Sequence, residues 1–178
     1  MTGNDRRIRE ARASDGAAIR KVHEDAFAGV DEHVPDLTMA LLADETARPM
    51  LVLVAEVDGD VVGNVIFSTV RVSGCEQVSA YLLVPLAVAK RVQRQGLGRD
   101  MIETGLRMLH ARGAKVVFVL GDPRYYGRFG FKPGHRVQAP YDLPYPEAWM
   151  ARALPGASLE GLCGTLVCAR SLNRPEYW

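Results

Sequence analysis

The order strand, glycine-bearing turn, helix, strand between residues 78 and 120 constrains the fold of this chain more than any other feature. Val78–Val88 is a long apolar run, and Gly98–Arg112 carries its apolar residues on one face, as expected of a helix. Gly113 ends that helix, and Lys115–Leu120 has the unbroken β-branched core typical of a buried strand. A crossover of this kind makes its two strands parallel, as neighbours or near neighbours in one sheet.

Further helices and strands are predicted on both sides of this unit. They are a helix capped by Ser14-Asp15, a helix over Pro35–Leu42, a hairpin of Leu51–Val57 and Val61–Val72, and strands around Ala148–Leu154 and Gly164–Ala169. The length of 178 residues fits one domain, and no linker divides it. The predicted fold class is α/β, a single domain over residues 1–178 with a mixed, mostly antiparallel sheet.

Composition and charge exclude several classes of protein. A net charge of +1 argues against a protein that wraps a polyanion, so no nucleic-acid partner is expected. The longest apolar run, Tyr81–Ala89, is too short to cross a membrane, and Met1–Arg12 is polar and charged, unlike a secretory signal. Cys75, Cys163 and Cys168 have no metal-ligand spacing and imply no disulfide framework. We expect a cytoplasmic protein, monomer or homodimer, without a membrane partner.

The turn Gln93-x-x-Gly96-x-Gly98 at the start of the crossover helix suits an anion. Its glycines let backbone N–H groups converge, the helix dipole adds partial positive charge, and Arg94 and Arg99 add charged donors. The turn is neither a P-loop, which needs Gly-Lys-Ser/Thr, nor a dinucleotide fingerprint, which needs a third glycine. From the glycines alone, a phosphate site and a tight turn without a ligand are equally supported.

Pro85 interrupts the strand Val78–Val88 at an interior position. A proline removes one ladder hydrogen bond, so strands tolerate it only at an edge or a bulge. A strand that continues into a crossover helix is seldom a plain edge, and we therefore favour a bulge that splays it from its parallel partner. An extended amide ligand such as pantetheine would then pair with the exposed backbone groups. An edge strand whose proline blocks aggregation is the alternative.

With these residues in place, the chain resembles the GNAT superfamily of acyl-CoA-dependent N-acetyltransferases. Leu86-Ala87-Val88 followed by Gln93-x-x-Gly96-x-Gly98 is similar to the cofactor motif of that superfamily. Tyr125–Phe131 is similar to its second signature, a tyrosine five residues before the Phe of a Gly-Phe pair. Leu120–Pro123, which leads into this signature, resembles the YhbS-like branch of predicted acetyltransferases.

This resemblance implies a fold, a co-substrate and site residues. It implies splayed parallel strands in a sheet flanked by helices, and acetyl-CoA or another short acyl-CoA as co-substrate, with no metal. Backbone groups of Leu86, Ala87 and Val88 would bind pantetheine. Backbone N–H groups of the turn would hold the pyrophosphate, namely those of Gln93, Arg94, Gln95, Gly96, Leu97, Gly98 and Arg99. Tyr126 would protonate the leaving thiolate, whereas Tyr125 would pack the short helix against the sheet.

The implied reaction acetylates a primary amine of a small molecule or peptide by direct attack. Family members often carry a carboxylate base on the strand before the cofactor loop, but Ser79–Val88 contains no Asp or Glu. The remaining base candidates are a water chain or one of four residues, each equally typical of a solvated surface. These residues are His23, Glu24, Glu32 and His33.

Two alternatives to catalysis stay open. The missing carboxylate motivates an acyl-CoA-binding sensor with little or no catalysis. The glycine loop alone would also fit a phosphate-binding protein of unrelated chemistry. An acidic cluster would attract a cationic amine or simply be solvated; its members are Asp31, Glu32, Asp36, Asp44 and Glu45.

Overall fold

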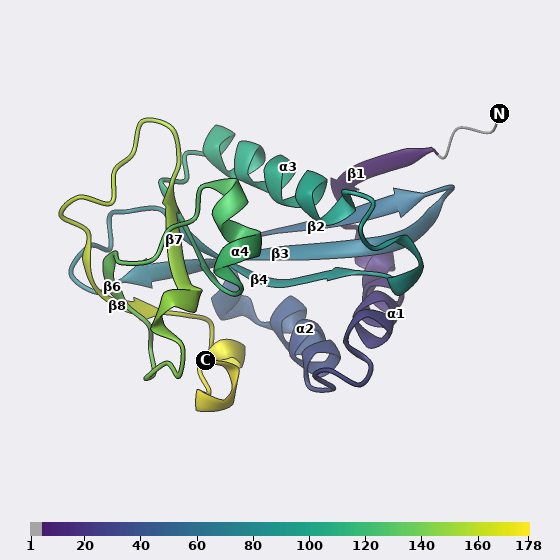
Figure 1. Ribbon diagram of the computed structural model, residues 1–178, viewed down its shortest axis with the longest axis horizontal. Coiled ribbons are helices and arrows are strands. Elements are labelled where there is room, and N and C mark those ends of the chain that lie inside the picture. The colour runs from purple at the N-terminus through teal and green to yellow at the C-terminus, as the bar shows by residue number, and fades with distance from the viewer. Residues whose placement is uncertain (1–4) are drawn as a thin grey trace.

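A mixed sheet forms the centre of the molecule in the computed structural model, which describes residues 5–178 (Figure 1). The predicted domain and the polar segment Met1–Arg12 both begin at residue 1, and residues 1–4 lie outside the described residues. The strand order is β1-β2-β3-β4-β5-β7, and β8 joins the end of β3 and pairs with β6. The strands are β1 Arg6–Glu10, β2 Met50–Val57, β3 Asp60–Val72, β4 Ala80–Val88, β5 Val116–Leu120, β6 Arg136–Gln138, β7 Trp149–Ala153 and β8 Cys163–Val167.

Within residues 5–178, four α-helices accompany the sheet. They are α1 Gly16–Phe27, α2 Val34–Ala43, α3 Leu97–Ala111 and the short α4 Pro123–Tyr126. Helix α3 covers one face of the sheet, and α1 and α2 cover the other (Figure 1). Apolar residues of α3 and of α2 pack into separate clusters with the sheet, which gives a core on each side. No helix within residues 5–178 is long and apolar enough to cross a membrane.

The structure confirms the predicted hairpin and crossover. Strands β2 and β3 pair antiparallel, and their turn places Asp58 and Gly59 at positive φ, as a two-residue hairpin turn requires. Strands β4 and β5 pair parallel on either side of α3 in sequence. Apart from the short β6–β8 pair, every other strand pair is antiparallel, so the predicted mixed, mostly antiparallel sheet is confirmed.

A bulge in β4 lies at Pro85, as predicted. Val65 of β3 pairs with Leu86 and Phe67 pairs with Leu83, so two residues of β4 oppose one residue of β3. Parallel pairing between β4 and β5 covers only residues 80–82 of β4 and ends at Leu82. The two strands therefore separate beyond Leu82, and the backbone of β4 from Pro85 to Val88 has no parallel neighbour.

One local prediction differs from the structure, and one strand was not predicted. Ser14-Asp15 does not cap α1, because the Asp15 carboxylate instead accepts hydrogen bonds from the Arg12 backbone N–H at 2.6 Å and from Arg9 at 2.7 Å. The charged segment Arg6–Glu10 forms the edge strand β1, which no apolar pattern predicts. Pairing with β2 and the ion pairs of Arg9 stabilise it, so tertiary contacts override the weak strand propensity.

Candidate active site

The glycine turn places the start of α3 against the end of β4. Arg94 has φ 61° and Gly96 has φ 87°, so the chain reverses through two left-handed positions before the helix begins at Leu97. The Asp100 N–H is bonded to the Gly96 carbonyl at 2.9 Å, and the amides before it have no helix carbonyl to bind. These amides and the positive end of the helix dipole lie at the turn for which the sequence predicts an anion site.

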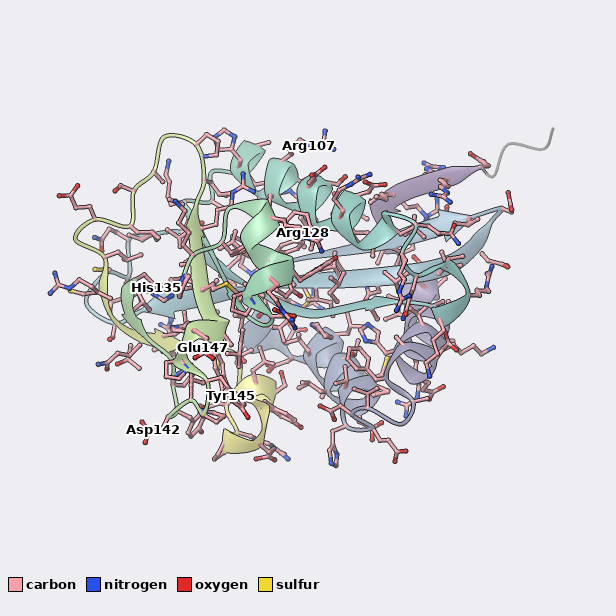
Figure 2. All side chains as sticks on the ribbon, in the orientation of Figure 1. Arg107, Arg128, His135, Asp142, Tyr145 and Glu147 are labelled. Carbon is pink, nitrogen blue, oxygen red and sulfur yellow. The ribbon has the colours of Figure 1, made fainter. Side chains whose placement is uncertain are left out.

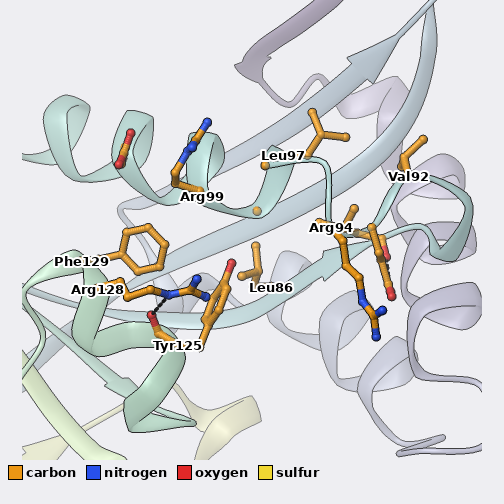
Figure 3. Close-up of a pocket in the computed structure, with 13 residues that line it drawn as sticks. Leu86, Val92, Arg94, Leu97, Arg99, Tyr125, Arg128 and Phe129 are labelled. Atoms are coloured by element: carbon orange, nitrogen blue, oxygen red, sulfur yellow. Dashed lines mark hydrogen bonds between the residues drawn. The ribbon is translucent and has the colours of Figure 1, made fainter.

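A cavity of about 770 Å³ opens onto this turn, and we call it the first cavity (Figure 3). Its lining residues come from the end of β4, the turn, α3 and the α4 segment: Leu86, Val88, Val92, Gln93, Arg94, Gly96, Leu97, Gly98, Arg99, Glu103, Tyr125, Arg128 and Phe129. Three arginines and one glutamate line it, so the cavity favours a polyanion.

An adjoining basic hollow of about 550 Å³ lies next to the first cavity and shares the lining residues Glu103, Arg128 and Phe129 with it. Arg107 of α3 lines one side, and Arg128, beside α4, lines the other (Figure 2). Arg152 also lines this hollow and donates to the Phe129 carbonyl at 2.6 Å. The positive charge therefore extends beyond the turn itself.

Gly98 leaves space in the first cavity between α3, Tyr125 and Val88. A Cβ at this position would lie 2.7 Å from the Tyr125 hydroxyl and 3.7 Å from Val88 Cγ2. Tyr125 therefore lines the cavity with its hydroxyl directed at α3, in addition to packing its ring against Phe129 at 5.4 Å. Sequence reasoning gave Tyr125 only the packing role, because a hydroxyl's direction is not visible in a motif.

Three of the predicted cofactor residues have their groups engaged elsewhere. The Gln93 side chain donates to the Val88 carbonyl at 2.9 Å and so fastens the turn to β4. Gln95 accepts from Arg6 of β1 with its side chain at 2.7 Å and does not line the first cavity. Ala87 is buried opposite Asn64, so only its backbone faces the gap beside β4.

A cavity of about 310 Å³ lies on the other side of the β4 bulge, and we call it the second cavity. It shares Leu86 with the first cavity. Its other lining residues come from the α1–α2 segment, β4, the end of β5, α4 and the C-terminal turn Pro175–Tyr177: Phe27, Asp31, His33, Val34, Leu37, Leu83, Val84, Pro85, Leu120, Gly121, Tyr126, Glu176 and Tyr177.

Tyr126 lines the second cavity together with Leu86, the residue that both cavities share. Its ring packs edge-on against Tyr125 at 5.0 Å and lies so close to Gly121 that a Cβ there would be 2.4 Å from the ring. Within residues 5–178 no group hydrogen-bonds the Tyr126 hydroxyl. Burial, and to a lesser extent the neighbouring Tyr125, raises the pKa of Tyr126, so the phenol is protonated at neutral pH.

Of the base candidates, only His33 lines the second cavity. Glu24 forms an ion pair with Arg20 at 2.9 Å on the exposed side of α1, and Glu32 lies outside the cavity lining. His23 is fully buried and hydrogen-bonded to Asn64 at 2.9 Å. Sequence reasoning missed Glu176, whose position near the end of the chain carries no motif.

The sequence matches the family described as acetyltransferase (GNAT) domain over residues 7–134. The chain belongs to the GNAT acetyltransferases. It is 38% identical to the uncharacterized N-acetyltransferase YjhQ of Escherichia coli K12 over 162 residues, 88% of each chain. It is 32% identical to the uncharacterized N-acetyltransferase YhbS of the same strain over 179 residues, 97% of this chain and 92% of YhbS.

Solved structures of GNAT proteins share the fold. Escherichia coli YhbS in complex with CoA matches with a TM-score of 0.87 and 30% identity, over 98% of this chain and 96% of YhbS. A GNAT acetyltransferase from Brucella melitensis in complex with acetyl-CoA matches with a TM-score of 0.77 and 31% identity, over 96% and 99% of the two chains. The predicted resemblance to the YhbS-like branch is thus confirmed, and this GNAT chain is an acyltransferase enzyme.

Proposed function

We propose that this GNAT enzyme transfers an acetyl group from acetyl-CoA to a primary amine of a small molecule or peptide by direct attack. The observation that carries this proposal is a pair of cavities that share Leu86 as a lining residue. The first is basic and opens onto the anion-binding turn, whereas the second is apolar and acidic. Direct attack requires both substrates at once, and separate cavities with a common point suit that requirement.

The first cavity fits acetyl-CoA in shape and charge. The β4 backbone from Leu86 to Val88 lacks a parallel neighbour. Apart from the Val88 carbonyl, which accepts from Gln93, its polar groups that are not bonded to β3 are proposed to pair with the amides of pantetheine as a further strand would. The first amides of α3, from Leu97 to Arg99, provide N–H donors for the pyrophosphate. The adjoining basic hollow with Arg107 provides charge for the nucleotide end. Bound acetyl-CoA supplies a thioester that an amine can attack.

Tyr126 is the proposed general acid. The amine nitrogen forms the new C–N bond, the C–S bond breaks, and the Tyr126 hydroxyl gives its proton to the departing sulfur. The Tyr126 hydroxyl has no hydrogen-bond partner in residues 5–178 and lines the same cavity as Leu86, which leaves it available for that contact. Burial raises the pKa of Tyr126, so the phenol carries the proton to be donated at neutral pH.

Paired phenylalanine variants test this role. Tyr126→Phe is expected to lower kcat by roughly 10²- to 10⁴-fold, the usual value of a general acid, while the Kd for acetyl-CoA stays within about twofold. Tyr145→Phe, at an exposed position outside both cavities, is the control and should retain turnover within a few-fold. Thiol release measures turnover and calorimetry measures affinity. A large loss of acetyl-CoA affinity with unchanged turnover in Tyr126→Phe would exclude the acid role.

His33 is the proposed base, acting directly or through water, because it is the candidate that lines the second cavity. His33→Gln should lower kcat/KM by roughly 10²- to 10⁴-fold, the usual value of a general base, with acetyl-CoA affinity unchanged. Glu32→Gln is the matched control, since Glu32 is adjacent in sequence but outside the cavity lining. Equal kcat/KM in His33→Gln and the wild type would refute the assignment.

The sensor alternative makes a different prediction. Tight acetyl-CoA binding without acetylation of any amine in a broad library would favour a regulatory module over an enzyme. Failure to bind CoA or acetyl-CoA, together with binding of ATP, would instead favour the unrelated phosphate-binding protein.

A further inference from the structure

We infer that the second cavity binds an amine that carries a second positive charge on a short apolar stem, with Asp31 and Glu176 holding the distal cation. This inference rests on the proposed function, because it assigns the second cavity to the acceptor. Asp31 lies in the segment between α1 and α2, and Glu176 lies in the C-terminal turn. That turn lies on the same side of the sheet as α2 (Figure 1), where the Ser171 N–H donates to Asp44 at 2.8 Å.

The formal charges that line the second cavity are negative. Among the described residues that line it, the carboxylates of Asp31 and Glu176 are the only formally charged groups besides the titratable His33. No lysine or arginine in that lining balances them. The first cavity, by contrast, is lined by three arginines and one glutamate. The two halves of the site therefore select opposite charges, and a cation is the matching occupant of the second.

Both carboxylates retain capacity for a ligand. Asp31 accepts one hydrogen bond, from the His33 backbone N–H at 3.1 Å. Glu176 is 3.8 Å from Arg174, and both side chains are more than half exposed, so this contact is weak. Other acidic residues of the same region are already engaged: Asp36 pairs with Arg20 at 2.7 Å.

Most of the other residues that line the second cavity are apolar. They include Phe27, Val34, Leu37, Pro85 and Tyr177. A methylene stem fits such walls, and the reacting amine at Leu86 must be neutral to attack. The second amine stays charged because it remains beside exposed carboxylates. A carboxylate at that end of the substrate would instead meet two like charges without a counter-ion.

Three acceptors of equal stem length test the inference. They are 1,6-diaminohexane, hexylamine and 6-aminohexanoate, which differ only in the charge at the distal end. The expected order of kcat/KM is diamine, then monoamine, then amino acid, with 6-aminohexanoate about tenfold or more below hexylamine. In Asp31→Asn/Glu176→Gln the three values should converge, while the Kd for acetyl-CoA stays unchanged. Glu160→Gln changes the net charge at an exposed position outside this cavity and should preserve the order.

Calorimetric titration of 1,6-diaminohexane into the CoA-bound protein separates this inference from the proposed function. Binding that the double variant abolishes supports the cation site even if no amine is acetylated, and the catalytic proposal alone would then fail. Equal use of 6-aminohexanoate and the diamine, or a preference for the diamine that survives in the double variant, would overturn the inference.

Discussion

At the scale of single residues, glycines set the positions of the two tyrosines at the site. Gly121 admits the Tyr126 ring, and Gly98 leaves space for the Tyr125 hydroxyl. Neither glycine has the positive φ that a turn glycine requires, so both are explained by close approach alone. The tyrosines thus reach the two cavities because side chains are missing opposite them.

His23 is a buried polar residue behind this site. The Asn64 side-chain N–H donates to the Leu53 carbonyl at 2.9 Å, which turns the Asn64 oxygen toward His23. His23 must therefore carry its proton on Nε2, and its Nδ1 is buried without a partner in the described residues. A second proton on the ring would place a charge there without compensation, and burial accordingly lowers the pKa of His23.

The buried histidine predicts a loss of stability in mild acid. Because the folded-state pKa lies below the ordinary 6.5, the unfolded chain binds more protons between the two values. The free energy of unfolding should be fully retained above pH 6.5 and should fall below it, by at most about 1.4 kcal/mol per pH unit for this group. Urea titrations at several pH values between 5 and 7.5 measure that slope.

A His23 variant identifies the group responsible. His23→Gln, which keeps a donor for Asn64, should reduce the slope between pH 5 and 6.5. It should not abolish the slope, because burial also lowers the pKa of His135. An identical slope in His23→Gln and the wild type would contradict the assignment.

At the scale of elements, the network around Arg9 explains why a charged segment forms a strand. Arg9 of β1 bonds Asp15 and Glu56, and the side chains of Arg9 and Asp15 are each only 10% exposed. The hydrogen bonds from Arg9 lower the pKa of Asp15 to about 2. The network joins β1, β2 and the turn before α1. The charged residues that make β1 hard to predict from the sequence therefore also stabilise it in the fold.

Helix α3 packs on β3 through Gly105. A Cβ at Gly105 would lie 2.2 Å from the Phe67 ring, which is fully buried. Gly105→Ala should therefore destabilise the protein by about 1–3 kcal/mol through overpacking, although alanine favours a helix by about 1 kcal/mol over glycine. Chemical denaturation measures the difference.

Gly16→Ala is the matched control for that substitution. Gly16 begins α1, and its Cβ would meet only Met39 Cε, at an ordinary distance of 3.9 Å. This variant should be neutral or slightly more stable than the wild type. Equal stability of the two alanine variants would show that α3 can shift away from Phe67.

At the scale of the whole molecule, the second cavity is assembled from segments that are remote in sequence. Its walls include Asp31 near the start of the chain, Pro85 in the bulge and Glu176 near the end. Backbone groups of the C-terminal segment bond side chains of the turn after α2, with the Arg170 N–H donating to Thr46 at 2.9 Å. Trp178 packs edge-on against Trp149 of β7 at 5.6 Å. The C-terminal turn is thereby held beside the site.

The sequence alone determined the parts that depend on neighbouring residues. The hairpin, the crossover and the glycine turn each follow from a continuous pattern of apolar residues and glycines. The bulge at Pro85 follows from the missing N–H of one residue, and Tyr126 of the second signature lines the second cavity. Such features require only the chain's own covalent geometry and local hydrogen bonding.

Only the tertiary structure decided which charged residues line the second cavity. His33, Glu32 and Glu24 are equivalent in the sequence, yet only His33 of these three lines it. Glu176 lines it because the C-terminal turn folds back beside segments that are remote in the sequence. A charge acts on what lies within a few ångströms of it, and no local pattern records which distant segment supplies that neighbour.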